Sequence, residues 1–479
     1  MDSGRTVDQK KIVFGVAGAL MCFLFSFVLH APASLESAAV AAGSSGPVAM
    51  RILGITLLAI LWWVGNVVSD WQTTLAMLIL WVVLAKVTFA AAFGAFSGHP
   101  VWLIIGALCL AVAVTKTGFF KRISWFLLRM ASPTFNGQLA AMLLVGTVCA
   151  PLVPTATAKA VLGVSIAANI ATAMGYGPES RGRCGLFVAA WLGFGASAPA
   201  FLTGSIFSYA LYGALPETTR TAITWTNWFV AMIPWLVVFL VGCFFTLKWL
   251  YQPQEGSAMT REHARDEYRK LGPMGTKETI SAALLAFAVA MWVLESVTGV
   301  NASITALIAA FLCFATGILE TKEISTAVPW GQVIFLGGVL SMGNVFSSVG
   351  INDWLQVILT PLFAQCGSGL ALVLVLTAMT LAARFVIASQ SAAIIIMMAI
   401  LAPVTQTLGI NLFIVGILVY AAGQCWFIPY QNVVFAPALA CMNGTVSHNS
   451  TVKGCVAYEV VSLLGGLASI PYWALLGYM

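Results

Sequence analysis

Two short clusters of hydroxyl, amide and basic side chains interrupt long apolar stretches of this chain. The first lies within residues 149–159 (CAPLVPTATAK) and the second within residues 384–393 (RFVIASQSAA). The prolines of the first cluster must end a helix, and Thr155 and Thr157 are suited to cap the helix that follows. Backbone N–H groups freed at such a break, together with the positive end of a helix dipole, favour an anion. We therefore expect an anion site where the two stretches break.

Two further apolar segments are interrupted after these clusters. Residues 193–205 (GFGASAPAFLTGS) and 423–432 (GQCWFIPYQN) combine Gly and Pro with hydroxyl and amide groups. A single Ser or Thr in a helix most often bonds its own backbone, whereas four such clusters together favour a ligand site. The residues that we expect to bind the substrate are Pro154, Thr155, Thr157, Lys159, Thr203, Ser205, Arg384, Ser389, Gln390, Ser391, Pro429, Tyr430, Gln431 and Asn432.

Each broken stretch carries one basic residue, Lys159 in the first and Arg384 in the second. No Asp or Glu occurs in either stretch, in residues 184–213 or in residues 411–440. Basic residues inside a membrane are costly and point to function. We therefore expect a carboxylate-free core whose two cations help to neutralise a bound anion. The alternative is that both side chains extend toward the nearest membrane interface.

The elements that carry these clusters are membrane helices. Only 8% of the 479 residues are charged and 60% are hydrophobic, whereas about 25% are charged in a soluble domain. This balance excludes a nucleic-acid binder and a disulfide-stapled module, and no cysteine or histidine spacing indicates a metal site. We expect an all-α polytopic membrane protein. The predicted spans are 12–29, 51–68, 73–90, 100–117, 184–212, 227–250, 279–298, 302–319, 330–348, 412–440 and 456–477, with broken hairpins at 137–174 and 369–407.

The basic residues set the predicted orientation. With the N-terminus in the cytoplasm and each hairpin returning to its own side, 17 of the 22 Lys and Arg residues face the cytoplasm. Three face outward (Arg51, Lys86 and Arg220), and Lys159 and Arg384 lie in the hairpins. Because basic residues concentrate on the cytoplasmic side, we expect a cytoplasmic N-terminus and a C-terminus outside.

An internal repeat is predicted by two matching glycine pairs. Gly106 and Gly118 are twelve residues apart, as are Gly338 and Gly350. Each pair lies in a block that consists of an apolar helix and a short interfacial helix with a Trp. A broken hairpin and then an interrupted span follow each block. The charge count gives the two blocks opposite orientations. Paired broken segments in inverted repeats are typical of the binding sites of secondary transporters.

These residues resemble a known family. Thr155-Ala156-Thr157-Ala158 and Ser389-Gln390-Ser391-Ala392 are similar to the paired Ser-Asn-Thr signatures of the divalent-anion/sodium symporters, which transport dicarboxylates, citrate and sulfate. The resemblance covers nearly the whole chain. It implies a homodimer with a scaffold domain and a mobile transport domain that works as an elevator. It also implies that the signature tips bind substrate carboxylates and that sodium is a candidate coupling ion.

The sodium sites that the resemblance implies fall on Val153, Pro154, Gly195, Ser197, Ala388, Gln390 and Gly423. The signatures differ here, because Pro154 and Gln390 stand where the family has Asn. Pro154 lacks both an amide side chain and an N–H, and Gln390 is longer than Asn. We hypothesise that Lys159 and Arg384 replace one or both sodium ions.

The predicted domains follow the repeats. N-terminal scaffold helices occupy residues 1–98, and the first repeat occupies 99–225 with its hairpin at 134–176. Scaffold helices and a cytoplasmic linker occupy 226–298. The second repeat occupies 299–479 with its hairpin at 369–407. The transport domain is expected mainly over 134–213 and 369–440.

The predicted function is secondary active transport of small organic anions, in the first place di- or tricarboxylates, either coupled to sodium or by exchange. An anion channel is one alternative, and a sodium/proton antiporter of related architecture is another, although it would be expected to carry an acid in the hairpins. Enzyme motifs are missing, and we expect no cofactor and no nucleic-acid partner. The expected partners are the small anion, the lipid bilayer and a second copy of the chain, in a bacterial inner membrane.

Overall fold

The structure, a computed structural model, describes residues 9–254, 261–363 and 369–479, and every regular element in these ranges is helical. In the same ranges nine helices are long and apolar enough to cross a membrane, or ten if the bent pair 321–327 and 330–348 forms one span. The all-helical membrane fold predicted from composition is confirmed. Every predicted span coincides with at least one helix.

The helices of membrane-crossing length are α1 (Gln9–Phe23, continued by a π-helical turn), α3 (Gly46–Gly65), α6 (His99–Lys116), α8 (Phe135–Cys149), α9 (Ala156–Ala173), α13 (Trp225–Tyr251), α15 (Thr276–Val293), α19 (Trp330–Ser348), α21 (Gly369–Val386) and α25 (His448–Leu475). Shorter helices of the same body are α4 (Asp70–Val83), α10 (Arg181–Trp191), α11 (Ile206–Ala214), α17 (Ala302–Ala315), α22 (Gln390–Leu408) and α23 (Leu412–Ala422). The connecting helices are α2 (Ala33–Ala41), α5 (Phe89–Phe93), α7 (Phe119–Leu128), α12 (Glu217–Ala222), α14 (Arg261–Lys270), α16 (Glu295–Thr298), α18 (Ile324–Ala327), α20 (Ile351–Phe363) and α24 (Phe435–Ala440).

One predicted span, 73–90, was placed wrongly. Helix α4 begins at Asp70, directly after Ser69, whose backbone and hydroxyl both donate to the Gln72 side chain. The helix ends at Val83, and Lys86 adopts a left-handed backbone with φ of 59°. Hydropathy extended the predicted span across this turn because the residues that follow it are apolar again.

The order of elements in the two predicted repeats is the same. Helix α6 is followed by α7, which carries Trp125, and α19 is followed by α20, which carries Trp354. Gly118 and Gly350 make the turns with φ of 83° and 72°, in the left-handed region that other residues rarely adopt. A broken helix pair and an interrupted segment follow in both halves. The opposite orientation of the halves in the membrane stays a prediction.

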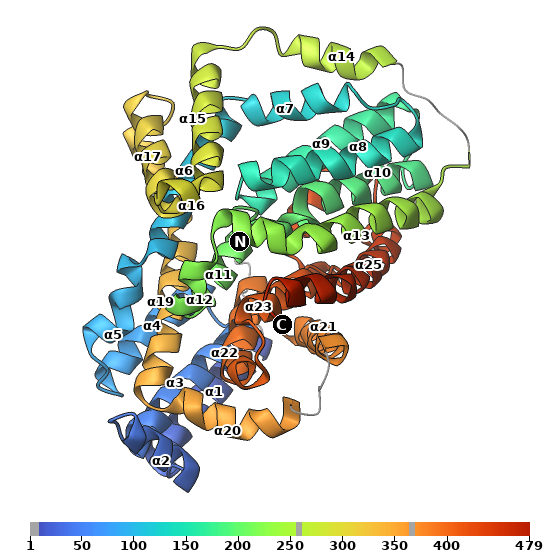
Figure 1. Cartoon of the computed structure of the whole chain (residues 1–479). Coiled ribbons are helices and arrows are strands. Elements are labelled where there is room, and N and C mark those ends of the chain that lie inside the picture. The colour runs from blue at the N-terminus through green and yellow to red at the C-terminus, as the bar shows by residue number, and fades with distance from the viewer. Residues whose placement is uncertain (1–8, 255–260, 364–368) are drawn as a thin grey trace, which may run out of the picture.

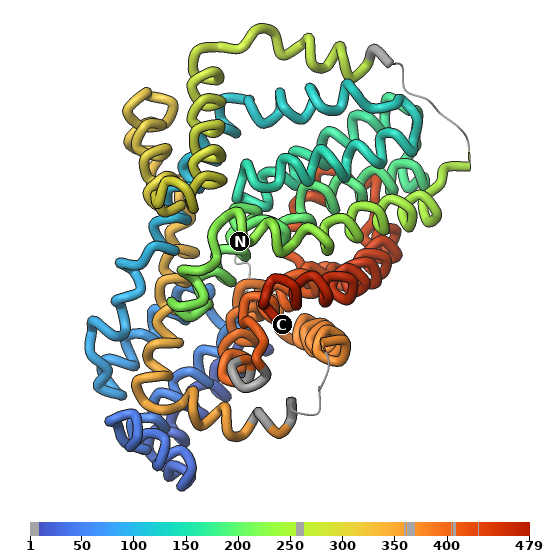
Figure 2. Tube along the Cα trace, viewed as in Figure 1, coloured from blue at the N-terminus to red at the C-terminus, as the bar shows by residue number. Residues whose placement is uncertain are grey.

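The helices form two groups, one packed along α13 and α25 and the other arranged as a column. Helices α13 and α25 lie side by side across the middle of the molecule, with α8–α10 on one side and α21–α23 on the other (Figure 1). The second group forms a column that includes α3, α4, α6, α17 and α19. In the tube view these helices are coloured from blue (α3) to orange (α19) (Figure 2). Helix α13 packs against α8 and α10, although it falls within the predicted scaffold segment 226–298. The domain boundaries themselves stay a prediction.

The amphipathic helix α7 is fixed by a buried ion pair. Arg122 donates from Nε to Glu278 Oε1 of α15 at 2.5 Å and from Nη1 to the carbonyl of Gly272 at 2.8 Å. Both side chains are about nine-tenths buried. The pair therefore ties α7 to the start of α15.

Candidate functional site

The first break lies between α8 and α9. Helix α8 ends at Cys149, a 3₁₀ turn covers residues 150–152, and α9 starts at Ala156. Lys159 lies in the first turn of α9, and its side chain is fully buried. Its ammonium group donates to the carbonyls of Ala150, at 3.0 Å, and of Gly204. Because the group is buried among carbonyls, extension toward a membrane interface is excluded for Lys159.

The predicted capping of α9 is wrong. Thr155 is the N-cap residue but makes no side-chain cap, and the Thr157 side chain is exposed within the first turn. The backbone explains the difference, because ψ is 92° at Thr155 but 159° at Thr134, whose hydroxyl caps α8. The first break is held by Lys159 and by the segment described next.

The interrupted segment after α10 contacts the first break. It consists of a π-helix over residues 192–196, a 3₁₀ turn over 198–200 and non-helical residues up to Ser205. Thr203 donates to the carbonyl of Pro151 at 2.9 Å and accepts from the Trp225 indole at 3.1 Å. Ser205 lies 2.5 Å from the hydroxyl of Tyr420 and caps α11. In contrast, Ser197 bonds its own helix, at the carbonyl of Gly193, and Gly195 is buried within the π-helix.

The second break, between α21 and α22, is held by Arg384. Its Nη1 donates to the carbonyls of Ile387 at 2.7 Å and of Ala388 at 3.0 Å, and the side chain is fully buried. The Gln431 amide donates to the carbonyl of Arg384 at 3.5 Å, and Gly423 lies against the Arg384 side chain. Arg384 therefore binds the carbonyls of its break as Lys159 binds those of the first.

The tip of the second break, formed by Ser389, Gln390 and Ser391, contacts an acidic residue that was not predicted from the sequence. Ser389 donates to Asp70 Oδ2, at the start of α4, at 2.7 Å, and accepts from the N–H of Ala392. The expectation of a carboxylate-free core is therefore wrong, because helices distant in sequence bring acids to the breaks. Gln390 is 2% exposed, and neither atom of its amide has a hydrogen-bond partner in the part of the chain that the structure describes.

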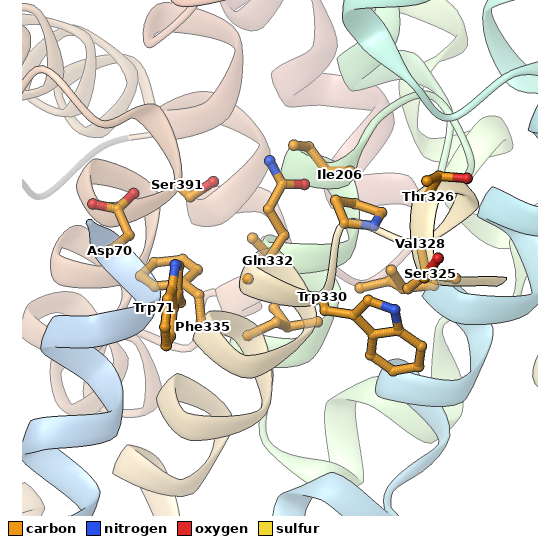
Figure 3. Close-up of a pocket in the computed structure, with 15 residues that line it drawn as sticks. Asp70, Trp71, Ile206, Ser325, Thr326, Val328, Trp330, Gln332, Phe335 and Ser391 are labelled. Carbon is orange, nitrogen blue, oxygen red and sulfur yellow. The ribbon is translucent and has the colours of Figure 1, made fainter. Parts of the chain in front are cut away.

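A cavity of about 490 Å³ lies at this tip (Figure 3). Its lining includes Asp70 and Trp71 of α4, Gln332 of α19, Ile206 of α11 and Ser391 of α22, and Ser391 lies near Asp70 in this view. Ile206 directly follows Ser205, and Thr203 touches the first break. Residues 203–206 therefore connect the first break to the cavity at the second.

The remaining predicted site residues whose side chains the structure describes do not line this cavity. Asn432 donates to the Gln424 carbonyl at 3.1 Å and accepts from the N–H groups of Val434 and Phe435, so it bonds within its own segment. Pro429 is exposed and lines a different cavity, beside His448. The side chain of Tyr430 lies outside the described residues. Val153 and Pro154 are buried at the first break, next to the half-buried Thr155.

Glu459 is a second acid that sequence reasoning missed. It lies in α25, on a helix that packs against α21, and its charge interacts with that of Arg384. The signal was present in the sequence, because an acid falls inside the predicted apolar span 456–477. Asp70 gave no such signal, because it precedes its predicted span by three residues.

Residues 21–477 match the family described as the sodium:sulfate symporter transmembrane region. The chain belongs to this family. The resemblance read from the two signatures is thereby confirmed, and the family consists of membrane transporters of small anions.

Several members with curated descriptions are similar to this chain. It is 27% identical to the chloroplastic dicarboxylate transporter 1 of Arabidopsis thaliana over 57% of this chain and 50% of that protein, so it spans half the length of that relative. It is 24% identical to the inner membrane protein YbhI of Escherichia coli K12, over 68% and 70% of the two chains. It is also 24% identical to the citrate/succinate antiporter of that bacterium, over 54% of each chain.

The fold is similar to a solved transporter structure. The crystal structure of the Alcanivorax borkumensis YdaH transporter matches with a TM-score of 0.55 over 81% of this chain and 88% of that one, at 16% identity. At this identity the likeness shows a shared fold alone.

Proposed function

We propose that the protein is a secondary transporter of small di- or tricarboxylates in a bacterial inner membrane, with a cytoplasmic N-terminus. The observation that carries the proposal is the Lys159 ammonium, which is buried between the carbonyls of Ala150 and Gly204. A buried cation at a break in membrane helices is costly and is retained where it serves a transported ion. Its sign fits an anion, as do the relatives named for dicarboxylates, citrate and succinate.

Lys159 and Arg384 take the place of bound sodium in this proposal. Each donates to backbone carbonyl oxygens at a helix break, and carbonyl oxygens at unwound helices are the ligands that coupling cations use in secondary transporters. A fixed ammonium or guanidinium group supplies the same charge without leaving the protein. Transport then needs no sodium. Because the fixed positive charges stay in the protein, they favour a carrier that moves only with an anion bound, and such a carrier exchanges one anion for another.

The substrate carboxylates bind at the second break in this proposal. Ser391 lines the cavity, and Ser389 donates to Asp70, which also lines it. The buried Gln390 amide has spare donor and acceptor capacity among the described residues. Asp70 accepts from Ser389 the hydrogen bond that a substrate carboxylate would also accept. Asp70 and the substrate therefore compete for one hydroxyl group.

The moving unit of the proposed elevator consists of α8–α11, α13 and α21–α25. Helices α8, α10, α21 and α23 pack on α13 or α25, and the remaining helices of the unit pack on these or on one another. The column of α3, α4, α6, α17 and α19 forms the scaffold and supplies the contact between two copies in a homodimer. The hydrogen bond from Ser389 to Asp70 then joins the moving unit to the scaffold.

A ligand screen tests the assignment of substrate. The purified protein is heated with four- to six-carbon dicarboxylates, citrate or sulfate, each with and without sodium. We expect stabilisation by a di- or tricarboxylate in both conditions, because a ligand that binds the folded state raises its melting temperature. Stabilisation by none of them would refute the assignment. Saturable counterflow in proteoliposomes distinguishes a carrier from an anion channel, which would give large unitary currents.

A further inference from the structure

The acid at position 459 is buried without a hydrogen bond. Glu459 is 6% exposed, and neither carboxylate oxygen accepts a hydrogen bond from any residue that the structure describes. It lies in the middle of α25, which packs against α10, α13, α21 and α23. A carboxylate without hydrogen bonds in such a place is far more costly as an ion than as the neutral acid. The position therefore favours a carboxyl group that binds a proton.

The charged group that acts on Glu459 is Arg384 of α21. The other groups that interact with Glu459 or with its neighbour Tyr458 are cysteines and tyrosines, which are neutral. Cys455 and Tyr458 flank Glu459 on α25, and Cys425 lies directly beyond α23. Cys243 of α13 and Tyr420 of α23 lie next to Tyr458. Arg181 and Arg183 of α10, Lys248 of α13 and Lys453 of α25 are charged, but none of them is among the groups that act on Glu459. Arg384 and Glu459 therefore lie on two helices that pack together, α21 and α25, and the other groups that interact with Glu459 are neutral.

The guanidinium group of Arg384 connects Glu459 to the second break. It binds the carbonyls of Ile387 and Ala388, which directly precede Ser389. An ionised Glu459 offsets the positive charge at these carbonyls, and a protonated Glu459 leaves that charge available to an anion at the tip. Binding of an anion at the tip and binding of a proton to Glu459 therefore favour each other. The anion takes over the role of the ionised carboxylate in balancing the charge of Arg384, so that Glu459 can become neutral.

We propose that Glu459 is a proton-binding site that takes up one proton with each transported carboxylate anion. This inference rests on the proposed function. Within the proposed moving unit, the fixed cations Lys159 and Arg384, a protonated Glu459 and a doubly charged dicarboxylate sum to zero charge, while Asp70 stays with the scaffold on α4. The proton comes from solution on the side where the anion enters, and it leaves from the neutral acid to solution on the side where the anion is released.

Calorimetry on the purified protein measures how many protons are taken up when one anion binds. A dicarboxylate such as succinate is titrated in two buffers of different ionisation enthalpy between about pH 7 and pH 9, where free carboxyl groups are ionised. We expect about one proton taken up per anion, and binding that weakens up to about tenfold for each unit of rising pH. Glu459→Gln should take up no proton and bind with nearly constant affinity. Glu320→Gln, at an exposed turn, is the matched control and should behave as the unmodified protein does.

The outcomes separate the two proposals. If no carboxylate binds, the proposed function fails. If carboxylate binds the unmodified protein without proton uptake, or if Glu459→Gln retains it, the proton site is refuted while the carrier stands. Absence of proton uptake by the unmodified protein refutes the proton site even if Glu459→Gln does not fold. Binding to the unmodified protein that requires sodium and releases no heat of buffer ionisation would also overturn the inference.

Discussion

The hydroxyl of Ser389 donates a 2.7 Å hydrogen bond to the carboxylate of Asp70, which lies 319 positions earlier in the chain. The two residues belong to different helix groups, since α4 packs against α3 and α19 whereas α22 packs mainly against α11, α20 and α23. The Asp70 carboxylate therefore accepts the hydrogen bond of a hydroxyl group that, in the proposed function, binds a carboxylate of the substrate. The contact also gives the two groups of helices a polar connection that substrate would have to break.

Neutralising Asp70 should tighten substrate binding. In Asp70→Asn the hydrogen bond from Ser389 loses its charged acceptor, and charge-assisted hydrogen bonds are about twice as strong as neutral ones. We expect a gain of about 1 kcal/mol, or roughly fivefold in affinity for a dicarboxylate, measured by calorimetry.

Asp353→Asn is the matched control for this change, because Asp353 is also an acid in the first turn of a helix, α20, but is exposed. It should leave the affinity unchanged. Weaker binding of substrate by Asp70→Asn would contradict the competition.

Removing the charge of Lys159 should abolish most anion binding. Lys159→Gln retains hydrogen-bond donors for the Ala150 and Gly204 carbonyls but lacks the buried charge. We expect affinity to fall on the order of 100-fold, which corresponds to about 3 kcal/mol. Lys121→Gln, at an exposed position of α7, should bind normally. In Lys159→Ala the space left between the carbonyls should admit a cation, so sodium should restore part of the binding. Full binding by Lys159→Gln without sodium would contradict the role of its charge.

The contact between Ser205 and Tyr420 should couple the two repeats. Their hydroxyl groups are 2.5 Å apart and both side chains are fully buried, so loss of one leaves the other without this partner. Ser205→Ala and Tyr420→Phe should each lower the free energy of unfolding by about 1 kcal/mol. The double variant should lose about 1 kcal/mol less than the sum, as measured by denaturant unfolding in detergent. Ser165→Ala, on an exposed face of α9, serves as the control. Strict additivity would show that the contact carries no coupling.

The ion pair between Arg122 and Glu278 should be more sensitive to loss of one partner than to loss of both. Arg122→Met leaves a largely buried carboxylate unpaired and should cost about 2 kcal/mol of unfolding free energy. Arg122→Met combined with Glu278→Leu should recover most of that loss. The exposed pair of Arg269 and Asp266 is the comparison, and Arg269→Met should have no measurable effect. A double variant less stable than Arg122→Met would contradict this account of how α7 is held.

The sequence predicted the features that arise from local composition. Apolar length gave the helices, prolines and polar clusters gave the four interruptions, and the glycine pairs gave the turns at Gly118 and Gly350. Lys159 and Arg384 were found because a charge inside an apolar stretch is visible without a structure. These features depend on neighbours within one or two helical turns.

Contacts between distant helices could not be predicted in the same way. Asp70 precedes its helix, and only the packing of α4 brings it to the tip at Ser389. The partners of Thr203, which are Pro151 and Trp225, likewise come from other elements. The end of α4 at Val83 was missed because hydropathy does not report a left-handed turn such as that at Lys86. Hydroxyl groups at a break suggested capping by Thr155, whereas the backbone torsion turned its side chain away.

Counterflow of a dicarboxylate in proteoliposomes, with sodium fully replaced by an organic cation, tests most directly whether fixed charges replace a coupling ion. The buried ammonium of Lys159 is present in every step of the cycle. The account therefore predicts a rate without sodium within about twofold of the rate with it, a difference of about 0.4 kcal/mol. Uptake by the unmodified protein that depends strictly on sodium would contradict it.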